Sequence, residues 1–283
     1  MDAVVPALCS AALYGAMTVA LRVALAGSRA SAELAALCTV LPAFAVALVA
    51  AVVRGEWDLS GLLPFVAAGV LGPGLSQTLF TLGVREAGPA RASVMVGAAP
   101  LFSVAIALVF PNEPIVAGVL AGAVLIVAGG VLLAVERDRP LHVRRIGLVF
   151  ALASAFVFAA RDNLVRWVAI GSHVTPELAA ATTLGTGALV IACWVLVVRR
   201  HVSLVPLRRF ALPGVFFGLS YVCIFEAFFR GPVTVVSPLV ATESLWGVGL
   251  SALFLRNVEV VGARLVLGAG AIVTGGVLIG VFR

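Results

Sequence analysis

Four charged side chains interrupt otherwise apolar stretches of this sequence and have the residue types best suited to chemistry: Arg161, Asp162, Glu226 and Glu243. A charge in hydrocarbon costs between about 2.5 and more than 10 kcal/mol, so such a residue needs a reason to be there. A buried carboxyl group can carry a proton or meet a cation, and a buried guanidinium can bind a carboxylate. These residues predict contact with a polar substrate or with each other.

Two of the four are expected at the same depth. Glu243 is ten residues into its apolar stretch, roughly 15 Å below the surface at about 1.5 Å per residue. Arg161 lies about eight residues before the end of another stretch, roughly 12 Å from the same face. We expect both to face a central cavity, where they would suit an amino acid or a similar zwitterion. The alternative is a structural pair that ties two helices together.

The other two charges have partners four residues away, and such pairs share a helix face. Asp162 is matched with Arg166, and Glu226 with Arg230, so each pair is expected to neutralise itself. Both carboxylates remain candidates for substrate contact.

Three uncharged residues complete the candidate site. Gln77 belongs to a polar patch after Gly72-Pro73-Gly74, a break that frees backbone groups to face a cavity. Tyr14 and Trp246 have rings that would close over a substrate, or that would pack against other helices.

The elements that must position these residues are membrane spans. The chain is 62% hydrophobic and 11% charged, with a mean hydropathy of +1.18, which does not fit a soluble domain of 283 residues. Apolar stretches of about 20 residues, enough to cross a bilayer, predict ten spans. They cover approximately 4–25, 33–53, 62–84, 89–110, 114–135, 146–168, 177–198, 210–229, 233–255 and 260–281.

The sequence also repeats itself. Arg22, Ser31 and the run Glu33-Leu34-Ala35-Ala36 return 144 positions later as Arg166, Thr175 and Glu177-Leu178-Ala179-Ala180, and later glycines return at nearly the same offset. Five spans per copy is an odd number, so the second copy is expected to lie upside down relative to the first. The predicted fold is all-α, with ten transmembrane helices in two inverted five-helix repeats, residues 1–137 and 138–283.

Arginines predict an orientation for these spans. All 19 basic residues are arginine. Twelve of them fall in the loops after spans 1, 3, 5, 7 and 9, against three on the other side, so the positive-inside rule favours both termini outside.

Several function classes are disfavoured. Without lysine there is no Walker A motif and no Schiff-base cofactor site, so we expect no cofactor. The three histidines and four cysteines are scattered without metal-ligand spacing, so we expect no metal. The net charge of +6 comes from dispersed arginines beside spans, which favours anionic lipid over nucleic acid as a partner.

The repeated features resemble the EamA-like family of the drug/metabolite transporter superfamily. In each family unit a fourth span with a proline precedes a Gly-Glu or similar turn and a glycine-rich fifth span. Here these are Pro100, then Glu113, then Gly118-x-x-x-Gly122 and Gly129-Gly130, with Glu259, Gly268 and Gly275-Gly276 in the second copy. The resemblance covers nearly the whole chain and implies a five-plus-five inverted repeat that exports or imports small metabolites.

The chain departs from this family in two places and in its charge distribution. Tyr14-Gly15 stands where the family often has Trp-Gly, and Ser244 stands where the first copy has Pro100. The family also implies cytoplasmic termini, opposite to the arginine count.

The function expected from these features is a secondary transporter, an exporter, of a small polar metabolite, working by alternating access. Transport against a gradient would draw on an ion gradient, and Glu243 is a proton-coupling candidate provided that Arg161 does not hold it ionised. The alternative is a membrane scaffold or an intramembrane enzyme. The composition suggests a GC-rich bacterium and its inner membrane, with the protein a monomer or a homodimer.

Overall fold

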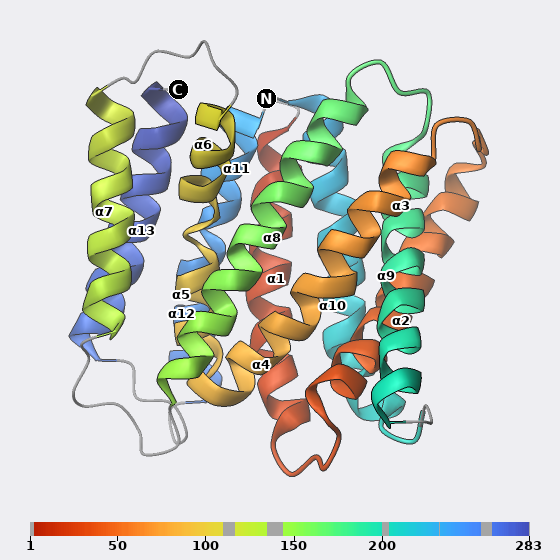
Figure 1. Cartoon of the computed structure of the whole chain (residues 1–283), viewed down its shortest axis with the longest axis horizontal. Coiled ribbons are helices and arrows are strands. Elements are labelled where there is room, and N and C mark those ends of the chain that lie inside the picture. The colour runs from red at the N-terminus through yellow and green to blue at the C-terminus, as the bar shows by residue number, and fades with distance from the viewer. Residues whose placement is uncertain are drawn as a thin grey trace.

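The computed structural model describes residues 3–109, 117–134, 144–199, 204–231, 233–255 and 262–282, and these residues form helices and connecting turns without a strand. The helices stand side by side, and both termini lie at the same edge of the molecule (Figure 1). Their bounds are α1 Val4–Leu25, α2 Ala32–Arg54, α3 Leu63–Gly69, π-helix η1 Val70–Ser76, α4 Gln77–Ala87, α5 Pro89–Val96, α6 Ala99–Val109, α7 Ala117–Ala134, α8 Arg145–Ala169, α9 Pro176–Arg199, α10 Leu207–Arg230, α11 Val233–Ala241, α12 Glu243–Phe254 and α13 Ala263–Phe282.

These helices fit ten crossings of a membrane. Within the described ranges, six helical stretches are long and apolar enough to span, one of them the continuous Leu63–Ala87. Shorter apolar helices make up the other four crossings, as α5 with α6, α7, α11 with α12, and α13. The expected fourth and ninth spans are therefore each broken near their middle.

Polar residues begin the helices where the sequence repeat lies. The Ser31 hydroxyl accepts a hydrogen bond from the Leu34 amide at 3.3 Å, and the Thr175 hydroxyl accepts one from the Leu178 amide at 3.4 Å. Each cap satisfies an amide that would otherwise lack a partner at the first turn. The repeated Ser/Thr positions therefore start the second helix of each half.

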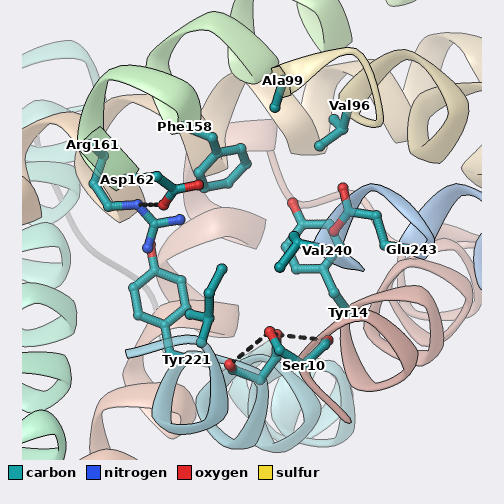
Figure 2. A pocket seen from close by; sticks show the side chains of 12 residues that line it. Ser10, Tyr14, Val96, Ala99, Phe158, Arg161, Asp162, Tyr221, Val240 and Glu243 are labelled. Carbon is teal, nitrogen blue, oxygen red and sulfur yellow. Dashed lines mark hydrogen bonds and ion pairs between the residues drawn. The ribbon is translucent and has the colours of Figure 1, made fainter. Parts of the chain in front are cut away.

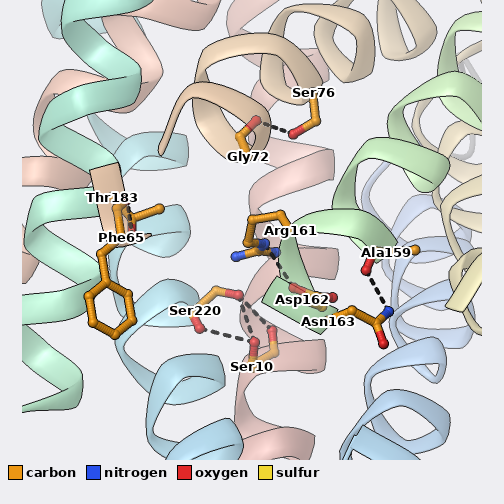
Figure 3. A network of polar contacts seen from close by, with 10 residues as sticks. All are labelled: Ser10, Phe65, Gly72, Ser76, Ala159, Arg161, Asp162, Asn163, Thr183 and Ser220. Carbon is orange, nitrogen blue, oxygen red and sulfur yellow. Dashed lines mark hydrogen bonds and ion pairs between the residues drawn. The ribbon is translucent and has the colours of Figure 1, made fainter. Parts of the chain in front are cut away.

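The third span is deformed where the sequence has Gly72-Pro73-Gly74. Pro73 has no amide hydrogen to donate, and the chain widens there into the π-helix η1. The Ser76 hydroxyl donates to the Gly72 carbonyl, and the Ser154 hydroxyl of α8 donates to the Ser76 carbonyl at 3.0 Å. Side-chain hydroxyls thus stabilise the deformed backbone inside the bundle (Figure 3).

Glycines allow pairs of helices to approach closely. A Cβ at Gly275 of α13 would lie 2.5 Å from the Gly122 carbonyl of α7, and one at Gly122 would lie 2.5 Å from the Gly275 carbonyl. Gly214 and Gly218 of α10 meet the backbone of α2 in the same way. These small-residue motifs serve packing within the chain.

Some sequence expectations need correction or fall outside the described residues. Arg91 lies in α5 and is 1% exposed, so it does not belong among the loop arginines. Glu113, Glu259 and the linker at 136–143 lie outside the described residues.

Candidate functional site

A cavity of about 40 Å³ lies where helices from both halves of the chain meet. Its lining side chains come from α1, α5, α6, α8, α10, α11 and α12 (Figure 2). They are Ser10, Tyr14, Val96, Ala99, Phe158, Arg161, Asp162, Ser220, Tyr221, Ile224, Val240 and Glu243. The volume holds a few water molecules, so a metabolite enters only if the helices move apart.

Arg161 and Asp162 form an ion pair on one side of this cavity. Nε of Arg161 lies 2.8 Å from Oδ1 of Asp162, and the two side chains are 4% and 13% exposed. The guanidinium also lies 4.8 Å from the Tyr221 ring centre and 5.3 Å from that of Phe158, within the range of cation–π attraction. Arg161 is thus held by a carboxylate and by aromatic faces.

This pairing corrects the expectation for Asp162. Its partner is the adjacent Arg161, whereas Nη1 of Arg166 donates to the Phe228 carbonyl at 2.7 Å. Glu226 does pair with Arg230, four residues on, as the spacing predicted.

Glu243 faces the same cavity from the opposite side (Figure 2). It is the first residue of α12, directly after the break at Thr242 that separates this helix from α11. Its side chain is buried, with 5% of the residue exposed. No Arg among the described residues lies within ion-pair distance of its carboxyl group. The structural pair between Arg161 and Glu243, the alternative drawn from the sequence, is therefore absent from the described residues.

Polar atoms without partners gather around this cavity. The hydroxyls of Tyr14 and Tyr221 and atom Nη1 of Arg161 are buried and have no hydrogen-bond partner among the described residues. Burying such groups without a partner costs roughly 1–3 kcal/mol each. Their convergence is typical of a site that water or a polar ligand fills.

Two serine pairs are related by the repeat, and one of them lines the cavity. Ser10 of α1 and Ser220 of α10 each donate to the other's carbonyl at 3.0 Å. Ser154 of α8 donates to the carbonyl of Ser76 in η1, also at 3.0 Å. Adding 144 to 10 gives 154, and adding 144 to 76 gives 220, so the two contacts join equivalent positions in exchanged roles.

The remaining candidates lie outside the cavity lining. Glu226 is paired with Arg230 near the end of α10. Trp246 is 46% exposed, and its Cβ packs over Gly15. Gln77 is fully buried, and neither its amide nitrogen nor its amide oxygen has a hydrogen-bond partner among the described residues. The cavity thus brings together Tyr14, Arg161, Asp162 and Glu243 and leaves these three apart.

Several lining residues were not singled out from the sequence, although the repeat offset marks them. Phe158 is 144 positions after Tyr14, and Val240 is 144 positions after Val96. Because both members of each pair line the cavity, projecting Tyr14 through the repeat would have identified Phe158. Ile224 carries no such signal.

Comparisons with known proteins give both a family and a fold. Residues 2–135 match the EamA-like transporter family. No curated protein matches the chain in sequence. The chain shares its fold with the crystal structure of another protein. The TM-score is 0.68 and the sequence identity is 20%, over 98% of this chain and 95% of the other.

The family assignment agrees with the apolar helices and with what members of the family do. EamA proteins are transporters and not enzymes, and the helices here are those of a multi-pass membrane protein. The first half of this membrane protein, residues 2–135, thus matches the EamA-like transporter family, which belongs to the drug/metabolite transporter superfamily.

Proposed function

We propose that this protein is a secondary transporter that exports a small polar metabolite, an amino acid or a similar compound, across the bacterial inner membrane. The observation that carries the proposal is the buried cavity with Arg161, Asp162 and Glu243 in its wall, in a chain whose first half matches the EamA-like family. Charges are costly inside a membrane bundle, and there they usually mark a substrate or ion pathway.

The proposed architecture is a pair of inverted repeats. Exchanged contacts support it: Ser10 with Ser220 corresponds to Ser154 with Ser76, which are joined by hydrogen bonds of 3.0 Å. A second exchange supports it at the membrane face. Arg22 donates to the carbonyl of Arg85 at 3.4 Å, and its repeat partner Arg166 donates to that of Phe228 at 2.7 Å.

Alternating access follows from this architecture. The cavity holds only a few water molecules and lies between helices of both repeats. Rocking one repeat against the other would open it to one side at a time. The serine pairs cross between the repeats, so they are placed to separate and re-form during this movement.

Proton coupling at Glu243 is part of the proposal. A carboxyl group in a buried cavity without an ion-pair partner can accept a proton on one side of the membrane and release it on the other. We expect that collapsing the proton gradient across the vesicle membrane abolishes accumulation of substrate. Unchanged accumulation would favour facilitated exchange instead.

The test is counterflow into proteoliposomes with a panel of labelled amino acids and organic cations. Wild-type protein is compared with E243Q, which removes the charge from the cavity and keeps the shape of the side chain. E226Q is the matched control, because it makes the same change at a carboxylate that lies outside the cavity and pairs with Arg230. We expect flux to be lost in E243Q and kept in E226Q. Full flux through E243Q would contradict a site at this residue.

A further inference from the structure

The charges around the cavity do not balance. Arg161 and Asp162 cancel each other across 2.8 Å, and Glu243 remains as a third charged group in the same lining. With Glu243 ionised, the cavity has one negative charge in excess. With Glu243 protonated, it is neutral.

Among the described residues that line the cavity, no other group supplies the missing positive charge. The titratable residues that line the cavity with Glu243 are Tyr14 of α1, Arg161 and Asp162 of α8 and Tyr221 of α10. Helix α5, which also packs against α12, carries the buried Arg91, which does not line the cavity. The lining residues of α5, α6 and α11 are uncharged.

Arg161 is already occupied on several sides. Besides Asp162, it lies 4.8 Å from the ring centre of Tyr221 and 6.0 Å from that of Phe225. A Cβ at Gly72 would lie 3.2 Å from Cγ of Arg161, so η1 covers the stem of the side chain. Nη1 of Arg161 has no hydrogen-bond partner among the described residues, but the positive charge that a substrate carboxylate would need is already balanced by Asp162.

We propose that the cavity selects a cationic group, an ammonium on an organic amine, which binds at Glu243 in exchange for a proton. This inference rests on the proposed transport function and narrows its substrate class from zwitterions to amines. A bound monocation neutralises the cavity with Glu243 ionised. If Glu243 releases its proton when a zwitterion binds, the excess negative charge stays in place, and an unbalanced charge is costly in a buried site. Exchange for the proton therefore favours a cation.

The repeat offers an independent observation. The positions 144 residues before Arg161, Asp162 and Glu243 are Met17, Thr18 and Ala99. Ala99 lines the cavity, and Met17 and Thr18 are fully buried in α1. The same helix positions therefore pack without charge in the first half. Charge at these positions is therefore not a general requirement of the helix packing, which favours ligand recognition as its role.

The test compares matched ligands that differ only in a carboxylate: phenylalanine with 2-phenylethylamine, and leucine with 3-methylbutylamine. Binding to purified protein in detergent is measured by calorimetry at neutral pH, and proton release by an indicator dye in weak buffer. We expect each amine to bind about tenfold or more tightly than its amino acid. Each amine bound should release close to one proton. E226Q should behave as wild type.

Two variants each remove one negative charge from the cavity. In E243Q the excess charge is gone, so amine binding should weaken about tenfold or more and proton release should stop. In D162N the freed Arg161 balances Glu243, so the amino acid should bind at least as tightly as the amine. If D162N does not fold, the E243Q result alone decides.

Equal or tighter binding of the amino acids by wild-type protein would overturn the inference, as would amine binding without proton release. Counterflow of the same compounds separates this failure from that of the transport function. Flux of amino acids with exclusion of amines contradicts the amine site and keeps the transporter. Amine binding with proton release but without flux keeps the site and contradicts transport.

Discussion

Arg161 and Asp162 are neighbours in the chain, and both are buried in α8. Removing one member of a buried ion pair leaves the other charge uncompensated and costs about 3–5 kcal/mol. We expect R161M to lower the free energy of unfolding by about this amount. Thermal unfolding of the purified protein in detergent measures the effect.

The double variant R161M/D162L tests whether the loss comes from the unpaired charge. Replacing a buried pair by apolar residues of similar volume is often neutral or stabilising. We expect the double variant to regain most of the stability of the wild-type protein. A double variant as unstable as R161M would mean that the aromatic contacts of the guanidinium, and not its charge balance, hold this part of the bundle.

The sequence predicted which residues are charged in the bundle but only one of their two pairings correctly. Spacing of four residues correctly joined Glu226 to Arg230. It failed for Asp162, because the Arg161 side chain turns back toward its neighbour beside the rings of Tyr221 and Phe158. The Tyr221 ring belongs to another helix, α10, so a rule for pairs on one helix face does not include it.

Helices α7 and α13 lie against each other at one edge of the bundle (Figure 1), and their contact depends on glycine. We expect G275A to lower the free energy of unfolding by about 1–3 kcal/mol, because its Cβ would lie 2.5 Å from the backbone carbonyl of Gly122. G270A is the control in the same helix, since a Cβ there meets nothing within 4 Å. It should be neutral or slightly stabilising.

Thermal unfolding of the two variants in the same detergent gives a direct comparison. Equal stability of G275A and G270A would show that α7 and α13 separate easily, and that the repeated glycines serve a purpose other than close packing.

At the level of elements, hydropathy predicted the helices more closely than their interruptions. The first span was expected at 4–25 and is Val4–Leu25, and the sixth was expected at 146–168 and is Arg145–Ala169. The breaks after Val96 and at Thr242 were not predicted, because a turn inside an apolar stretch does not change hydropathy. Only the third span had a local signal, the Gly72-Pro73-Gly74 sequence, and there the helix does widen into η1.

For the whole molecule, the cavity draws on distant parts of the sequence, from Ser10 in α1 to Glu243 in α12. The sequence repeat helps to explain this arrangement, because equivalent positions of the two halves line the same cavity. The span lengths predicted that Arg161 and Glu243 lie at a similar depth in the membrane. Only the structure shows that they lie on opposite sides of the cavity and that Asp162 stands beside the arginine (Figure 2).

The orientation of the molecule in the membrane is a prediction of the arginine count, even with Arg91 removed from it. In a cysteine-free background, W57C and V205C report on opposite faces, because Trp57 lies in the turn between α2 and α3 and Val205 in the turn between α9 and α10. Both residues are exposed, by 50% and 90%. With the termini outside, a membrane-impermeant maleimide should label W57C in intact cells and V205C only after lysis.

The two cysteines control for each other, because any ten-span arrangement places them on opposite faces. Labelling of V205C alone in intact cells would reverse the orientation and place the termini in the cytoplasm, as the family resemblance implies. The arginines beside α10 would then face outward against the positive-inside rule. In that case the contacts of Arg209 with the carbonyls of Ala24 and Ala26 would explain the position of this arginine better than membrane topology does, since they fix the end of α1 to the start of α10 in either orientation.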